Sequence, residues 1–243
     1  MNDLDKKSKK TPDQPQWRIF LVDDHPMLIE GLAKLVEQIP QCMVCGQASS
    51  ATEALDKIPS AMPDLVITDI SLPDKNGLEL IKDLNSILPD LKILTFSMHD
   101  EMLYAARTLK AGARGYLMKG ADTNLLEKAV NRVLKNGIYL SPQVADHLLR
   151  NMSGGTLPQS RLQVLSDREL EIFELIGRCR SISQISDQLN ISPKTVDAHR
   201  GNIKAKLNLT DAASLMREAI LWIELEKDSA SESETKKEKN TCT

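Results

Sequence analysis

The sequence predicts two folded units: a doubly wound α/β domain on a five-stranded parallel sheet, and an all-α domain of four helices after it. Five short apolar runs alternate with amphipathic stretches between residues 18 and 138. Runs that are apolar on both faces are typical of parallel strands covered by helices on two sides. Residues 166–225 instead show only helical periodicity and helix-capping patterns, which predicts the second unit.

The first unit is expected over residues 17–138 as five strand–helix pairs. The strands are expected at residues 19–22, 43–46, 65–68, 92–96 and 115–118. The helices are expected at residues 27–38, 51–58, 77–88, 101–111 and 123–135. This order predicts a flavodoxin-like fold, in which ligands bind at the carboxyl ends of the strands.

The second unit is expected over residues 166–225. Ser166 and Glu169 form a capping-box pattern, and Ser192 before Pro193 marks the start of another helix. The Gly- and Pro-containing segment between the two units, residues 139–165, is predicted to be a linker with one short helix at its start. Both polar ends are predicted to be disordered, a 16-residue arm at 1–16 and a tail at 226–243.

The composition predicts a globular protein of the cytoplasm. Hydrophobic residues make up 41% of the chain, no run is long enough to cross a bilayer, and the N-terminus lacks the apolar core of a signal peptide. The net charge of -3 means that any nucleic-acid site must be a local patch. Four cysteines are too few for a disulfide framework. Cys42 and Cys45 are predicted to be ordinary strand cysteines, because the alternative, a zinc half-site, lacks two further ligands at a matching spacing.

Polar side chains follow four of the predicted strands. Asp23 and Asp24 follow the first strand, Asp69 the third, Ser97 the fourth and Lys119 the fifth. These positions meet at one edge of a parallel sheet, where three carboxylates repel one another unless a cation lies among them. Oxygen ligands favour Mg²⁺. One carboxylate can then attack a phosphoryl donor to form an acyl phosphate, with the lysine and the hydroxyl binding the phosphoryl oxygens.

These segments together resemble the receiver domain of two-component response regulators over residues 18–138. The resemblance lies in the strand-ending Asp pair, TDISLPDKNGLEL around Asp69, TFSMHDE around Ser97 and GARGYLMKG around Lys119. It implies that Asp69 is the phosphoacceptor and that Lys119 binds the phosphate. It also implies a magnesium site formed by Asp23, Asp24, Asp69 and the backbone carbonyl of Ser71.

The same resemblance implies a switch and a loop. Ser97 is expected to move toward the phosphoryl group and Tyr116 to follow it inward, whereas the alternative for Tyr116 is a plain aromatic at the surface edge. Pro73 and Gly77 are expected to shape the loop after Asp69. Ser71 and His99 stand two residues after Asp69 and Ser97, where the family places residues that set the phosphate lifetime. Gly120 departs from the acidic residue or proline that many relatives carry after the pocket lysine.

A helix-turn-helix is predicted in the second unit. Ile182, Ile185 and Leu189 form one stripe, a short turn follows at 190–192, and PKTVDAHRGNIKAKL comes next. In that last segment Val196, Ile203 and Leu207 share one direction and form the core stripe. The opposite face carries small residues that allow close approach to DNA, and residues 194–206 hold four basic side chains and one acidic. The set expected to contact DNA is Lys194, Thr195, Asp197, Ala198, His199, Arg200, Gly201, Asn202, Lys204 and Lys206.

Within this set the roles are expected to differ. Lys194, Asp197 and Asn202 can reach base edges, while Lys204 and Lys206 suit the two phosphate walls. The segment resembles the LuxR-type domain of NarL/FixJ response regulators through LSDRELEIFELI, ISQISDQLNISPKTVDAHRGNIKAKLNL and the closing helix. Relatives often carry lysine at the position of Asp197. The resemblance implies a dimer face on the last helix, made of Ala212, Leu215, Met216, Ala219 and Trp222, for which the alternative is burial within the domain.

Together these features predict a phosphorylation-dependent transcriptional regulator rather than an enzyme, with self-phosphorylation and self-dephosphorylation of Asp69 as its only chemistry. The expected partners are a sensor histidine kinase, promoter DNA and a second copy of the chain, with RNA polymerase as a further candidate and no membrane. The resting receiver is expected to pack over the recognition helix or its dimer face. Two rivals are a phosphotransfer enzyme or phosphatase, and a protein-binding module that never touches DNA.

Overall fold

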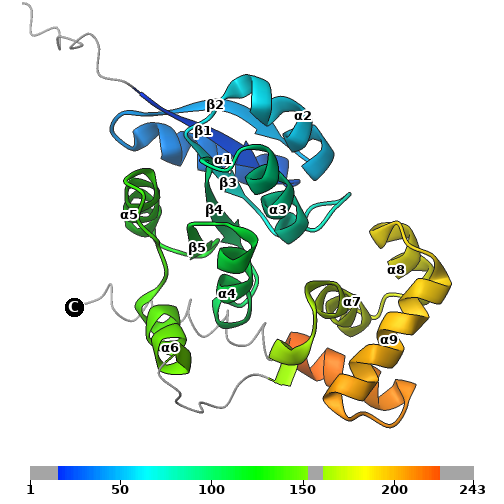
Figure 1. Ribbon diagram of the computed structural model, residues 1–243. Coiled ribbons are helices and arrows are strands. Elements are labelled where there is room, and N and C mark those ends of the chain that lie inside the picture. The colour runs from blue at the N-terminus through cyan, green and yellow to red at the C-terminus, as the bar shows by residue number, and fades with distance from the viewer. Residues whose placement is uncertain (1–15, 153–160, 225–243) are drawn as a thin grey trace, which may run out of the picture.

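A computed structural model describes residues 16–152 and 161–224 (Figure 1). Its first unit is a five-stranded parallel sheet in the order β2-β1-β3-β4-β5. The strands are β1 (Trp17–Val22), β2 (Cys42–Ala48), β3 (Leu65–Thr68), β4 (Lys92–Ser97) and β5 (Gly115–Met118). The chain reverses its direction of travel across the sheet after β2, so β1 and β3 lie side by side at the switch point.

Helices cover both faces of this sheet. They are α1 (Pro26–Gln38), α2 (Ala51–Ala61), α3 (Gly77–Ile87), α4 (Glu101–Ala111) and α5 (Thr123–Leu134). One buried cluster joins α1 and α5 to one face of the sheet, and another joins α2, α3 and α4 to the other face. The doubly wound, flavodoxin-like fold predicted from the apolar runs is confirmed.

The second unit is all helical. After α6 (Pro142–Met152), the short 3₁₀ turn η1 (Arg161–Val164) leads into α7 (Asp167–Gly177), α8 (Ile182–Leu189) and α9 (Pro193–Leu207), and residues 212–224 form a further helix. Capping explains where these helices begin. The predicted capping box of Ser166 and Glu169 starts α7, and Ser192 caps α9 with a proline in the first turn.

The two units share a continuous apolar core. The cluster beneath α2, α3 and α4 extends through Val144 of α6 and Leu162 of η1 to Phe173 of α7 and Val196 of α9. Figure 1 shows α7 between α4 and the α8–α9 pair. The helical unit is therefore docked on the α4 side of the receiver-like unit through its first helix.

Several details differ from the sequence-based expectation. The second helix continues to Ala61, past Pro59, which lies inside its last turn. The short helix predicted at the start of the linker is α6, but it is not a free linker element, because its Val144 is buried and packs in the core. The expected disordered tail and all but the last residue of the arm lie outside the described residues.

Cys42 and Cys45 are free and lie in β2. Burial raises the pKa of the Cys42 thiol to about 11, which suits a small apolar side chain rather than a metal ligand. Across residues 16–152 and 161–224, no helix combines the length and apolar character that a membrane span requires.

Candidate functional site

Three carboxylates and one lysine meet at the carboxyl edge of the sheet. Lys119 follows β5, and its Nζ lies 2.6 Å from Asp23 Oδ2 and 2.7 Å from Asp69 Oδ2. The side chains of Lys119, Asp23 and Asp69 are at most 4% exposed. Asp24 stands beside them, so the pocket carries more negative than positive charge. The sheet topology therefore does bring together the pocket residues predicted from the strand ends.

The charges in this pocket depend on one another. Burial disfavours the charged ammonium of Lys119, but Asp69 and Asp23 together outweigh it and raise the pKa of Lys119. Asp24 Oδ1 is buried without a hydrogen bond among the described residues, and His25 Nδ1 lies 2.7 Å from it. Asp23, Asp24 and His25 offer ligand atoms within 4.8 Å of one another. Buried carboxylates in excess of cations, with one oxygen left unsatisfied, fit a hard divalent cation.

The loop after β3 is held tightly around Asp69. The backbone N–H of Ile70 donates to Asp69 Oδ1 at 2.6 Å, which orients that carboxylate. A Cβ on Gly77 would lie 2.3 Å from the Asp69 carbonyl oxygen, so only glycine permits this approach of α3. Asp74 accepts hydrogen bonds from the backbone N–H groups of Ala51 and Thr52, which fixes the loop to the start of α2.

Ser97 and Tyr116 both lie inside the domain. Ser97 is fully buried at the end of β4, and Tyr116 is 1% exposed. The Tyr116 hydroxyl donates to the carbonyl oxygen of His99 at 2.8 Å, and burial holds the pKa of Tyr116 well above its ordinary value. The alternative of a surface-edge aromatic at Tyr116 is therefore wrong, because the ring is inside and tied to the β4–α4 loop.

His99 connects the pocket to the helical unit. Its Nε2 lies 2.8 Å from Ser71 Oγ, and its Nδ1 lies 3.5 Å from Glu174 Oε1 of α7. Tyr104 of α4 stacks near His99 with ring centroids 4.6 Å apart and donates its hydroxyl to the same Glu174 oxygen. Burial lowers the pKa of His99 to about 4 and raises that of Glu174 to about 7. The sequence reading missed Glu174 and Tyr104; the available signal was an acidic residue inside the apolar run IFELI.

A second set of polar contacts holds the two units together. Arg107 of α4 donates to Asp167 Oδ1 at 2.9 Å and to the carbonyl oxygens of Leu165 and Leu162 at 2.9 and 3.2 Å. Lys82 of α3 binds the other oxygen of Asp167 at 2.8 Å. The start of α7 is thus fastened to both α3 and α4. No sequence pattern predicted these pairs, since their members lie at least 55 residues apart.

The helix-turn-helix has the predicted core and the predicted polar face. Val196, Ile203 and Leu207 of α9 are buried, whereas the opposite face is exposed and has open space around Gly201. Of the side chains expected to contact DNA, the exposed ones are Lys194, Asp197, Ala198, Gly201, Asn202 and Lys206, and the half-buried ones are Thr195, His199, Arg200 and Lys204. The exposed face of α9 is therefore polar and includes small residues, as the sequence predicted.

Three of these side chains already form ion pairs. Asp197 accepts from Arg200 at 2.9 Å, so its carboxylate orients a neighbouring cation. Lys206 binds Glu169 of the α7 capping box at 2.6 Å, which directs it toward α7 rather than freely into solvent. The helical wheel placed Asp197 and Lys206 on the polar side of α9, but it could not reveal the ion pairs that they form.

The last helix needs a correction. Leu215 and Ala219 are fully buried within the domain, where Gly177 of α7 packs against the Ala219 backbone. Their assignment to a dimer face is therefore wrong, because these residues fill the domain's own core. Trp222 is half-buried and stacks 5.9 Å from Phe173, while Ala212 and Met216 remain exposed.

The expected packing of the receiver over the recognition helix is also not seen. The interdomain contacts described above run to α7, and the polar face of α9 is open to solvent. Figure 1 shows α9 on the side of α7 away from the sheet. The physical reason is that α7 carries the partners that match Arg107 and Tyr104, namely the half-buried Asp167 and the buried Glu174.

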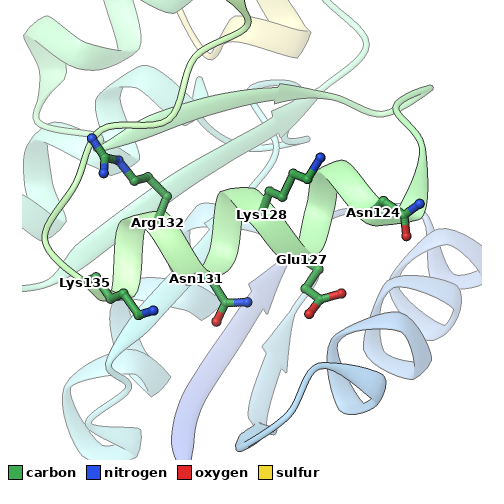
Figure 2. A pocket seen from close by; sticks show the side chains of 6 residues that line it. All are labelled: Asn124, Glu127, Lys128, Asn131, Arg132 and Lys135. Carbon is green, nitrogen blue, oxygen red and sulfur yellow. The ribbon is translucent and has the colours of Figure 1, made fainter.

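A shallow hollow along α5 has a different character. Figure 2 shows its lining side chains, which come from α5 and its C-cap residue Lys135: Asn124, Glu127, Lys128, Asn131, Arg132 and Lys135. The inner side of the same helix is apolar, with Leu126, Ala129 and Val130 buried against the sheet. Charges of both signs opposite an apolar stripe are typical of the solvated face of an amphipathic helix.

The fold and the acidic pocket define a receiver-type domain, and the helical unit defines a helix-turn-helix domain. Comparison with known families agrees. Residues 19–131 match the response regulator receiver domain, and residues 163–219 match the bacterial regulatory proteins of the luxR family. The chain belongs to the two-component response regulators of the NarL/FixJ family, which regulate transcription through a LuxR-type domain.

Individual relatives resemble most of the chain. It is 34% identical to the response regulator GacA of Pseudomonas viridiflava over 82% of this chain and 92% of that protein. It is 32% identical to the response regulator UvrY of Escherichia coli over 83% of this chain and 93% of that one. Among solved structures, RcsB of Salmonella enterica serovar Typhimurium, bound to promoter rprA with the phosphomimetic BeF₃⁻, has a TM-score of 0.64 at 25% identity. That match covers 83% of this chain and 97% of RcsB.

Proposed function

We propose that Asp69 accepts a phosphoryl group and that this modification controls promoter binding and dimerisation by the LuxR-type domain. The carrying observation is the buried contact of Lys119 Nζ with both Asp69 and Asp23, at 2.7 and 2.6 Å. An Asp69 oxygen would form a bond to phosphorus as the donor's bond to phosphorus breaks. Lys119 would then bind the phosphoryl oxygens, and the hydroxyl of Ser97 would reach them from the neighbouring strand.

A Mg²⁺ ion would be held by Asp23, Asp24, Asp69 and the backbone carbonyl of Ser71. Bound there, it would neutralise carboxylate and phosphoryl charge during transfer. The residues of this chain do the rest: the Ile70 N–H orients Asp69, and the Tyr116 hydroxyl holds the loop that contains His99. The only chemistry proposed is phosphorylation and dephosphorylation of Asp69 itself, so the protein acts as a switch rather than as an enzyme on other substrates.

The exposed face of α9 is the proposed DNA surface. Lys194, Asp197 and Asn202 would read base edges, and Lys204 and Lys206 would contact phosphates on either side. The full proposed set keeps the members named from the sequence: Lys194, Thr195, Asp197, Ala198, His199, Arg200, Gly201, Asn202, Lys204 and Lys206. Lys206 is bound to Glu169, so it would have to leave that carboxylate before its ammonium could bind a DNA phosphate.

Phosphorylation would weaken the docking of the receiver on α7, since the receiver does not cover the polar face of α9. A receiver that prefers a different β4–α4 loop when phosphorylated would weaken the contacts of Tyr104 and His99 with Glu174. Release of α7 would free the two DNA-binding domains of a homodimer to meet two half-sites. The exposed residues Ala212 and Met216, with the half-buried Trp222, remain the proposed dimer face.

We place this activity in the cytoplasm, with a sensor histidine kinase as phosphoryl donor, a second copy of the chain and double-stranded promoter DNA as partners, RNA polymerase as a candidate partner and no membrane. The test is selection from random duplex DNA by the full chain, with and without acetyl phosphate and Mg²⁺. A two-fold symmetric site enriched more strongly after phosphorylation supports the proposal. Equal enrichment by the parent and by Asp69→Ala, each with phosphodonor, overturns the switch.

A further inference from the structure

A carboxylate of the DNA-binding domain reaches the edge of the receiver pocket. Glu174 of α7 lies in a buried group with His99 and Tyr104, whose exposed fractions are 6, 7 and 2% respectively. His99 in turn contacts Ser71, two residues after Asp69, at 2.8 Å. A continuous line of contacts therefore runs from the loop beside Asp69 to the first helix of the DNA-binding domain.

Glu174 determines which way the His99 ring presents its nitrogens. The Glu174 oxygen accepts from the Tyr104 hydroxyl and lies 3.5 Å from His99 Nδ1, a separation that electrostatic attraction still spans. A carboxylate there favours the tautomer with hydrogen on Nδ1. The lone pair of Nε2 then faces the Ser71 hydroxyl and the Asp69 side of the loop. The same logic orients the histidine of an acid–histidine pair in hydrolytic sites.

His99 is held in place from three further directions. The Tyr116 hydroxyl binds its carbonyl oxygen, the Tyr104 ring stacks beside its imidazole, and the negative charge of Asp69 acts on the ring electrostatically. Of these groups and Glu174, only Glu174 belongs to the DNA-binding domain. Its contact with His99 is therefore the part of this arrangement that domain separation removes.

We propose that Glu174 is a positioning residue for hydrolysis of the phosphoryl group on Asp69, acting through His99 and Ser71, so that domain docking sets the phosphate lifetime. This inference rests on the proposed phosphorylation of Asp69. In the hydrolysis, a water oxygen bonds to phosphorus, the bond from phosphorus to the Asp69 oxygen breaks, and inorganic phosphate leaves with the Asp69 carboxylate restored. The oriented Nε2 and the Ser71 hydroxyl align that water. A released DNA-binding domain withdraws Glu174, and the phosphate then persists longer.

The experiment measures the half-life of the phosphorylated full chain. Parent and variants are labelled with acetyl phosphate and Mg²⁺, the donor is removed, and the phosphorylated fraction is followed on phosphate-affinity gels. Glu174→Leu, which removes the acceptor, is expected to lengthen the half-life about 10-fold, the lower end of effects seen for orienting partners. Glu174→Gln keeps an oxygen that accepts from Tyr104 and His99, and is expected to restore a half-life near that of the parent.

Two further variants separate positioning from general destabilisation. In a His99→Asn background, Glu174→Leu is expected to cause no additional change, because its effect passes through the imidazole. Glu218→Leu, which removes an exposed acid paired with Arg161 on the last helix, is the matched control and should leave the half-life unchanged. Should Glu174→Leu not fold, Tyr104→Phe replaces it, since loss of the hydroxyl frees the same carboxylate and should also lengthen the half-life.

The outcomes distinguish the two proposals. A parent chain that acquires no label, or a label that survives Asp69→Asn, overturns the proposed function and this inference with it. A parent that is labelled on Asp69 but shares its half-life with folded Glu174→Leu overturns only the inference. An equal effect of Glu174→Leu with and without His99 also overturns it, because Glu174 would then act by another route.

Discussion

Arg107 is the residue whose removal should most directly loosen the docked arrangement. Its guanidinium is 12% exposed, and it donates to Asp167 and to the carbonyl oxygens of Leu165 and Leu162. Arg107→Ala removes all three contacts at once while leaving the surface of α4 otherwise intact. The receiver and the DNA-binding domain should both remain folded, because the buried apolar clusters do not include this side chain.

The size of the effect follows from these contacts. A hydrogen bond to a charged group contributes about 1.5–3 kcal/mol, and the three donated by Arg107 do not add fully because they share one cation. Lys82 stays within 2.8 Å of Asp167 and keeps that carboxylate paired. We therefore expect Arg107→Ala to weaken docking by about 2–3 kcal/mol, which lowers the ratio of docked to undocked protein roughly 30- to 150-fold.

Amide hydrogen exchange measures this change. Exchange in η1 and at the start of α7 should accelerate in Arg107→Ala, whereas exchange in the central strands β1, β3 and β4 should stay as slow as in the parent. Arg132→Ala on the solvated face of α5 is the control and should leave both regions unchanged (Figure 2). Unaltered exchange around α7 in Arg107→Ala would refute the reasoning that this arginine fastens the two domains.

Three other predictions concern separate parts of the molecule. Gly77→Ala should lower the free energy of unfolding by at least about 2 kcal/mol in denaturant titrations, because its Cβ would lie 2.3 Å from a backbone oxygen; an unchanged midpoint would contradict this. Burial raises the pKa of Glu174 to about 7, so the folded state binds that proton more tightly than the unfolded state. The ionisation of Glu174 therefore lowers the free energy of unfolding of the parent, by nothing below about pH 4.5 and by an amount that grows until about pH 7. Glu174→Gln lacks this ionisation, so its free energy of unfolding should rise relative to that of the parent by up to about 3 kcal/mol across that window. A difference between the two that does not depend on pH would argue against this reasoning. Asp197→Lys should steepen the salt dependence of DNA binding by about one unit or more in log–log slope and change the selected site, whereas an unaltered slope would remove this residue from the interface.

Local patterns predicted the elements of both domains well. The apolar runs located all five strands, and the residues that follow them located the pocket, because the carboxyl ends of parallel strands share one edge whatever the distance along the chain. Helical periodicity likewise identified the buried stripe of α9 and its exposed face. In each of these cases a short segment carries its own information about which side faces the core.

The last helix shows a case in which helical spacing does not predict what a stripe of residues contacts. Ala212, Leu215, Met216, Ala219 and Trp222 share helical spacing, but spacing alone cannot tell a stripe that meets a partner from one that meets its own domain. The close approach permitted by Gly177 buries Leu215 and Ala219 against the rest of the domain. The packing of α7 against the last helix thus buries some of these residues and leaves others exposed, although their spacing in the sequence is uniform.

The sequence by itself determined the two folds, the acidic pocket and the exposed polar face of α9, because strand-end chemistry and helix periodicity are local properties. Only the tertiary structure decided how the domains meet. The contacts of Arg107 with Asp167, and of Tyr104 and His99 with Glu174, join residues 60 or more positions apart. No local periodicity records such a pairing, because it arises when one folded surface docks on another and each buried polar group finds the partner it requires.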